Sequence, residues 1–132
     1  MSRTTSYAYD LSGNIVQKTL ANGTAEVRSH DGRNRVSTLD NETSVGANLA
    51  SYGYQYDRAG NVMEVAETYP SGGLSNRTIT NSYDGVYRLI QEQIATTGGS
   101  TVTTAYNLRQ GAQPPEQGDQ RRGGHDLRAG QW

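Results

Sequence analysis

The chain of 132 residues contains no cysteine and no phenylalanine, and only three of its residues are proline. Without cysteine there can be no disulfide bond and no thiolate metal site. Leu, Ile and Val together number 20 of the 132 residues, which is below the roughly 20% at which a packed apolar core becomes hard to build. The large net charge that usually accompanies disorder is also missing, because the formal charge is −1. We therefore expect an ordered, polar chain with a thin core.

Other absences bear on whether the chain binds a membrane or nucleic acid. No apolar run approaches the roughly 20 residues of a membrane-spanning helix, so we expect no membrane insertion. The first five residues hold no apolar stretch typical of a signal peptide. The near-neutral charge gives no reason to expect a nucleic-acid partner. These features alone leave the localisation open.

Tyrosine is abundant, and it recurs in a pattern. Residues 54–62 read Tyr-Gln-Tyr-Asp-Arg-Ala-Gly-Asn-Val, and residues 7–15 read Tyr-Ala-Tyr-Asp-Leu-Ser-Gly-Asn-Ile. Two tyrosines spaced two apart share one face of a strand. The following aspartate can bond backbone N–H groups of a turn, and the glycine three positions later suits the left-handed residue of a type I turn with a bulge. Both stretches therefore predict β-hairpins.

Weaker copies of the pattern follow the strong ones. One contains Asp31, with Asn34 at the glycine position, and another contains Tyr83 and Asp84, with Tyr87 at the glycine position. Asparagine tolerates a positive φ, whereas tyrosine does not, so we expect the turn at Tyr87 to differ. A fifth copy starts at residues 106–107 and then breaks off. The anchors are Asp10, Asp31, Asp57, Asp84 and Asn107, spaced by 21, 26, 27 and 23 residues, which indicates a repeat array.

The pattern Tyr-x-Tyr-Asp-x-x-Gly-Asn-aliphatic resembles the YD repeat of RHS-repeat proteins, a group that includes bacterial RHS toxins, wall-associated proteins, toxin-complex C components and teneurins. The resemblance covers about residues 5–107. It implies β-hairpins that spiral into a hollow shell, which in bacterial members encloses a C-terminal toxin. It also suggests a secreted or cell-surface protein. Because four or five repeats are too few to close a shell, the resemblance further implies a fragment of a larger member.

We accordingly expect an all-β chain, with antiparallel hairpins forming part of an open curved sheet or shell wall. The expected strands cover residues 5–9, 14–20, 24–30, 34–39, 51–56, 61–68, 77–83, 88–96 and 101–106. Residues 40–48 are polar and aperiodic, which predicts a loop. The spacing of Ile90 and Ile94 would also suit a helix. Val16 and Leu20 are expected to be buried.

The composition changes after Leu108. Residues 109–132 are rich in Gly, Gln and Arg and contain Pro114 and Pro115. We expect a repeat array over residues 1–108 and a disordered tail over 109–132, because so polar a segment cannot offset its ordering entropy. The change falls inside the fifth copy, so the tail is either the product of a frameshift or a linker.

No residue stands out for covalent chemistry. The aspartates are expected one per turn, whereas hydrolytic carboxylates work in close pairs. The two histidines, His30 and His125, are far apart and have no cysteine beside them, so we expect no metal and no cofactor. The residues singled out are structural: Tyr7, Tyr9, Asp10, Gly13, Asp31, Asn34, Tyr54, Tyr56, Asp57, Gly60, Tyr83 and Asp84.

The sequence therefore predicts a non-catalytic segment of a β-shell that scaffolds or encloses a toxin domain. Its expected partners are neighbouring repeats of a longer chain or the toxin domain itself. The alternative is a carbohydrate-binding or adhesive module, because rows of exposed tyrosine can stack on sugars. Exposure of Tyr7, Tyr9, Tyr54 and Tyr56 separates the two hypotheses.

Overall fold

The computed structural model describes residues 4–70 and 73–107, and within them it contains nine β-strands and no helix. The strands are β1 (Ser6–Tyr9), β2 (Ile15–Thr19), β3 (Ala25–His30), β4 (Val36–Glu42), β5 (Asn48–Tyr56), β6 (Val62–Thr68), β7 (Arg77–Tyr83), β8 (Leu89–Thr96) and β9 (Thr101–Ala105). The all-β prediction is confirmed. The tail predicted at 109–132 lies outside the described residues.

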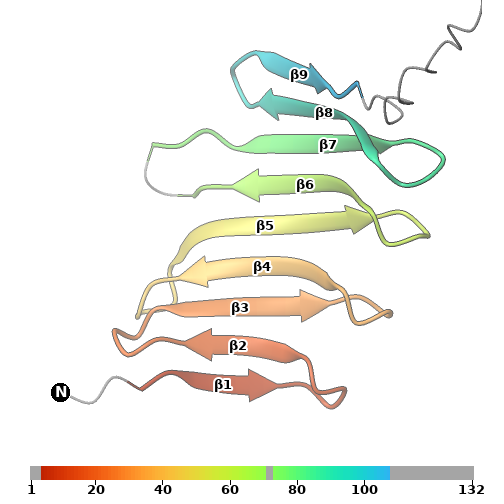
Figure 1. Ribbon diagram of the computed structural model, residues 1–132. Helices are drawn as coiled ribbons and strands as arrows, with labels where there is room; N and C mark the ends of the chain where they lie inside the picture. Colours follow the sequence, from red (N-terminus) through yellow and green to blue (C-terminus); the bar gives the residue numbers. More distant parts are fainter. Residues whose placement is uncertain (1–3, 71–72, 108–132) are drawn as a thin grey trace, which may run out of the picture.

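Each strand pairs with the next strand along the chain, and every pair is antiparallel. Figure 1 shows the result, a single open sheet that does not curl, in which the order in space equals the order in sequence. Antiparallel neighbours need only tight turns between them, so this topology follows directly from the hairpin signals. Over the described residues, β1 and β9 pair on one side only.

Four turns that begin with an aspartate lie at one end of the strands, on the right in Figure 1. We call them the aspartate turns: residues 10–14, 31–35, 57–61 and 84–88. In each, the aspartate N–H donates to the carbonyl four residues on, and the N–H three residues on donates back to the aspartate carbonyl. That third residue needs a positive φ, and it is Gly13, Asn34, Gly60 or Tyr87.

The expectation that the turn at Tyr87 would differ was wrong. Tyr87 has a φ of 64° and donates its N–H to the Asp84 carbonyl at 3.0 Å, as the glycine does in the other turns. The Asp84 carboxylate accepts from the N–H groups of Val86 and Arg88, which closes the turn from inside. These hydrogen bonds outweigh the cost of a left-handed tyrosine, which is roughly 1–2 kcal/mol.

Replacing Tyr87 with asparagine should therefore stabilise the protein by about 1 kcal/mol, because asparagine tolerates a positive φ. The Tyr87 side chain is exposed, so little packing is lost. Urea unfolding monitored by circular dichroism measures the change. Val86→Asn is the matched control, since Val86 is an equally exposed neighbour without a positive φ. A lower unfolding midpoint for Tyr87→Asn than for the parent would refute the expectation.

At the other end of the strands, the chain contains more strand and a better-defined turn than the sequence indicated. Residues 40–48, interpreted as a loop, instead complete β4 and begin β5. The bulged turn Thr43–Ala47 joins these strands, and Thr43 plays the part of the aspartate, because its Oγ1 accepts the Ala47 N–H at 3.0 Å. Gly46, three residues after Thr43 with a φ of 77°, was the available signal. Because this turn begins with threonine, a pattern that begins with aspartate does not include it.

Three smaller predictions concern the burial of Val16 and Leu20 and the conformation around Ile90 and Ile94. Val16 is half-buried, but Leu20 is exposed, because it opens the turn that leads to β3. Residues 89–96 form strand β8, so the helical interpretation of Ile90 and Ile94 is wrong. Pairing with β7 and β9 on both sides overrides the local helix preference.

The two faces of the sheet differ in chemistry. Side chains alternate along each strand, and paired residues share a face. The pairs Tyr7↔Lys18, Lys18↔Glu26, Glu26↔Asn41 and Asn41↔Ala50 therefore put these residues on one face, together with other tyrosines at two-residue spacing. We call it the tyrosine face; it carries Tyr7, Tyr9, Tyr52, Tyr54, Tyr56 and Tyr83. The opposite, polar face holds Ser, Thr, Gln and Ala, for example Gln17, Thr80, Gln93 and Thr103.

The core is as thin as the composition predicted. Among the described residues only Ala50 and Glu67 are buried, and both lie on the tyrosine face. A single-layer sheet cannot remove more apolar surface from water, so stability depends on contacts between neighbouring hairpins, as in other repeat arrays.

Candidate functional site

The aspartate turns hold the most distinctive side chains of the sequence pattern. In the turn 57–61, Asp57 Oδ1 accepts the N–H groups of Gly60 at 2.7 Å and Asn61 at 2.9 Å. Asp57 Oδ2 accepts Asn61 Nδ2 at 2.7 Å. In the other three turns the aspartate Oδ1 accepts the N–H groups two and four residues on, and Oδ2 accepts from the side chain of Asn14, Arg35 or Arg88. Each carboxylate is thus fully engaged in closing its own turn.

These hydrogen bonds favour the charged carboxylate. The side chain of Arg35 lowers the pKa of Asp31 from 3.8 to about 2. The Asn14 and Asn61 side chains lower the pKa values of Asp10 and Asp57, and the backbone N–H of Arg88 does so for Asp84. A general acid or base near neutral pH needs the opposite shift. The arrangement therefore favours a structural role for all four aspartates.

The lowered pKa values predict acid sensitivity. Because the folded pKa of each aspartate lies below the unfolded value, its stabilising effect is full above about pH 4 and is lost as the pH falls toward 2. We expect the melting temperature to fall steeply between pH 4 and pH 2. Thermal melts across this range test the expectation, with Asp31→Asn as the control that should show a shallower fall. A flat profile from pH 5 to pH 2 would contradict it.

In the third and fourth hairpins, the second tyrosine of the motif binds the hairpin to the previous one. The Tyr56 hydroxyl donates to the Val36 carbonyl at 2.7 Å, and the Tyr83 hydroxyl donates to the Val62 carbonyl at 2.9 Å. In both cases the acceptor is the first residue of the preceding return strand. We call this contact the tyrosine tie. It explains why a tyrosine, rather than another ring, precedes the aspartate.

Arg35 strengthens the tie between the second and third hairpins, a role that the sequence pattern did not predict. Its guanidinium lies 4.3 Å from the centre of the Tyr56 ring, forms an ion pair with Asp31, and donates to the Asp57 carbonyl at 3.2 Å. Arg33 also crosses to the next turn and donates to the Arg58 carbonyl at 2.9 Å. An arginine four residues after the aspartate, at the asparagine position of the motif, was the only signal.

Two residues occupy the tyrosine-tie position without making the contact. The Tyr9 side chain is 60% exposed, and β1 has no preceding strand among the described residues. His30 stands at the same position in the second hairpin, and its Nδ1 is buried with no hydrogen-bond partner in the described chain. An imidazole is shorter than a phenol, which accounts for the missing tie.

The buried carboxylate of Glu67 is the centre of a second contact group. Glu67 accepts from Arg77 and from the Tyr69 hydroxyl, and the Tyr69 ring packs edge-on against Tyr52 with ring centres 6.5 Å apart. Burial raises the pKa of Glu67, but the hydrogen bonds from Arg77 and Tyr69 outweigh it and leave the pKa lowered. The same contact raises the pKa of Tyr69 to about 12. The Glu67 carboxylate is therefore paired with Arg77 and Tyr69, as in a structural network.

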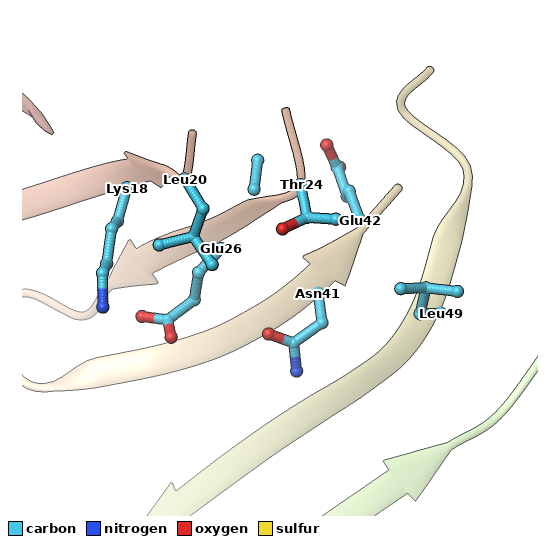
Figure 2. A pocket seen from close by; sticks show the side chains of 8 residues that line it. Lys18, Leu20, Thr24, Glu26, Asn41, Glu42 and Leu49 are labelled. Carbon is cyan, nitrogen blue, oxygen red and sulfur yellow. The ribbon is translucent and has the colours of Figure 1, made fainter. Parts of the chain in front are cut away.

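Two hollows lie toward the strand ends opposite the aspartate turns. The first, of about 220 Å³, spans β2 to β5 and is lined by Lys18, Leu20, Thr24, Ala25, Glu26, Asn41, Glu42 and Leu49 (Figure 2). The second, of about 280 Å³, is lined by Tyr69, Leu74, Ser75, Arg77 and Thr96. Figure 2 shows Lys18, Glu26 and Asn41 pointing to the same side, while Glu42 points away from them. The ionisable side chains of the first hollow are Lys18, Glu26 and Glu42, and those of the second are Tyr69 and Arg77.

Metal and membrane signals are equally weak over residues 4–70 and 73–107. No group of three histidine, aspartate or glutamate side chains comes together there to hold a metal ion. None of these residues belongs to a helix of sufficient length and hydrophobicity to cross a lipid bilayer. Asn107, the last predicted anchor, lies two residues after the end of β9, next to Tyr106, whose N–H donates to the Ile90 carbonyl at 2.8 Å.

No family model and no curated protein matches the chain. Among solved structures it is similar to a chain of the Photorhabdus luminescens Tc holotoxin pore with mutated TccC3, at 17% identity and a TM-score of 0.44 over 78% of this chain. It is also similar to a chain of the TcdB2-TccC3-Cdc42 structure, at 17% identity and a TM-score of 0.45 over 76% of this chain. A chain of the TcdB2-TccC3-TEV structure matches at 17% identity and a TM-score of 0.43 over 78% of this chain. The chain spans only 7% of the length of each.

Proposed function

We propose that residues 1–108 are a non-catalytic repeat array that contributes to the wall of a larger β-shell, and that this shell scaffolds or encloses a toxin domain. The YD-repeat resemblance supports the shell. The all-antiparallel meander supports an extensible wall, because each hairpin adds to the edge of the last. A secreted or cell-surface location belongs to the same proposal.

The tyrosine tie is the observation that carries the proposal. It occurs at equivalent positions in two successive hairpins, with hydroxyl-to-carbonyl distances of 2.7 and 2.9 Å. A contact that each repeat makes to the backbone of the preceding repeat can propagate without limit and does not depend on the neighbour's side chains. Neighbouring repeats are therefore the natural partners of this chain, and the toxin domain is the natural partner of the assembled wall.

The experiment begins with the coding sequence on both sides of the chain. We expect further in-frame Tyr-x-Tyr-Asp-x-x-Gly motifs and a polypeptide beyond them that resists protease while the shell is folded. The control is the same polypeptide expressed without the repeats, which should be cut rapidly. Flanking sequence without such motifs, or equal cleavage rates in the two proteins, would contradict the proposal.

Carbohydrate binding remains the second candidate, because the exposure of the tyrosines is divided. Tyr7 and Tyr9 are 49% and 60% exposed, whereas Tyr54 and Tyr56 are half-buried, as packing residues would be. Exposed rings on an open face can stack on sugars. Binding on a glycan array that is lost on Tyr9→Ala but retained on Leu11→Ala, an exposed residue outside the tyrosine face, would favour this function. An array without signal would remove it.

A further inference from the structure

Strand β9 ends the described sheet with an unprotected edge. All five of its residues, Thr101–Ala105, are exposed, and they pair with β8 only. Natural sheets guard such edges with lysine, proline, bulges or very short strands. Strand β9 has no charge and no proline, and its pairing with β8 shows no bulge. An edge of this kind is suited to pairing with another strand.

The groups that point outward from β9 can be assigned from its pairing. The Tyr106 N–H points toward β8, because it donates to the Ile90 carbonyl. In antiparallel pairs the backbone groups alternate in direction from residue to residue, so Thr104 and Val102 also point toward β8. The N–H and carbonyl groups of Thr101, Thr103 and Ala105 therefore point away from the sheet. They form a regular row of three donors and three acceptors.

We propose that β9 pairs with β9 of a second copy of this chain, antiparallel, about a two-fold axis that is perpendicular to the sheet and passes midway between the two Thr103 residues. Thr103 then lies opposite Thr103, and Thr101 lies opposite Ala105. The three outward N–H groups of each copy find carbonyls on the other copy, which gives six hydrogen bonds. Residues opposite each other lie on the same face, so the tyrosine faces of the two copies continue into one another. With no charge in β9, no like charges are brought together.

The other open edge is less suitable for self-pairing. Strand β1 has four residues, and its pairing with β2 is interrupted by a register shift between Ala8 and Tyr9. The exposed Tyr9 also stands at the tyrosine-tie position, where the neighbour should offer the carbonyl of a return strand. A second β1 would not offer it, because β1 is itself a leading strand.

Charge substitution at Thr103 tests the pairing. Analytical ultracentrifugation of the wild-type chain should give twice the 14.3 kDa mass of one copy. T103K and T103E should each give a single copy, because like charges would then face one another across the axis. A mixture of the two variants should restore the double mass. T80K is the matched control; Thr80 is exposed on the same face but lies in the interior strand β7, so this variant should remain a dimer.

Three outcomes would overturn the proposal. The proposal fails if the wild-type chain sediments as a single copy, if T103K keeps the double mass, or if the mixture of T103K and T103E stays monomeric. Circular dichroism of each variant establishes that the sheet is still formed, so that loss of the dimer can be distinguished from loss of the fold. These outcomes are measured on the 132-residue chain by itself, so they do not test the proposed shell.

Discussion

Replacing Gly23 with alanine should lower the free energy of unfolding by roughly 2–5 kcal/mol, the largest effect that we expect from a single methyl group in this protein. Two costs add at this position. Gly23 has a φ of 84°, which costs an L-residue roughly 1–2 kcal/mol. A Cβ at Gly23 would also lie 2.8 Å from the Cβ of Ser44 in the neighbouring turn. Overpacking of this kind costs roughly 1–3 kcal/mol.

Gly13→Ala is the matched control. Gly13 has the same φ of 84°, but a Cβ there would have no neighbour within 4 Å. It should therefore show only the backbone cost. Ser44→Gly in the Gly23→Ala background should recover the steric part, which a double-mutant cycle measures directly. If Gly23→Ala and Gly13→Ala unfold at the same urea concentration, the turn that contains Gly23 does not contact the turn that contains Ser44, contrary to the structure.

Removing the hydroxyls of Tyr56 and Tyr83 together should cost roughly 2 kcal/mol, since each hydrogen bond contributes about 1 kcal/mol net. The Tyr56→Phe/Tyr83→Phe variant keeps both rings, including the surface on which Arg35 packs. It loses only the donors to the Val36 and Val62 carbonyls. Urea unfolding should show a lower midpoint with an unchanged slope, because the strands themselves remain paired.

Tyr9→Phe provides the comparison for this loss. Tyr9 occupies the same motif position but makes no tyrosine tie in the described chain, so its hydroxyl should contribute little. Equal effects for Tyr9→Phe and Tyr83→Phe would mean that the hydroxyl acts through solubility or solvation rather than through the contact with the preceding hairpin. The role of the tie in building a wall would then lose its support.

Much of the local structure could be predicted because its causes are local. Asp57 closes its turn through residues three and four positions away, and Gly60 supplies the positive φ that the turn needs. Such contacts appear in the sequence as fixed spacings. The turn at Tyr87 was mispredicted because intrinsic preference was weighed without the hydrogen bonds of Asp84. The turn at Thr43 was missed because a threonine hydroxyl did the work of a carboxylate.

The sequence by itself determined the hairpins, their order and the absence of a thick core, because these follow from turn chemistry, two-residue alternation and composition. Only the tertiary structure decided how one hairpin holds the next. The tyrosine tie joins Tyr56 to Val36 and Tyr83 to Val62, across some twenty residues of chain. Its acceptor is a backbone carbonyl, a group that every residue carries, so no pattern of side chains could single it out until the strands lay side by side.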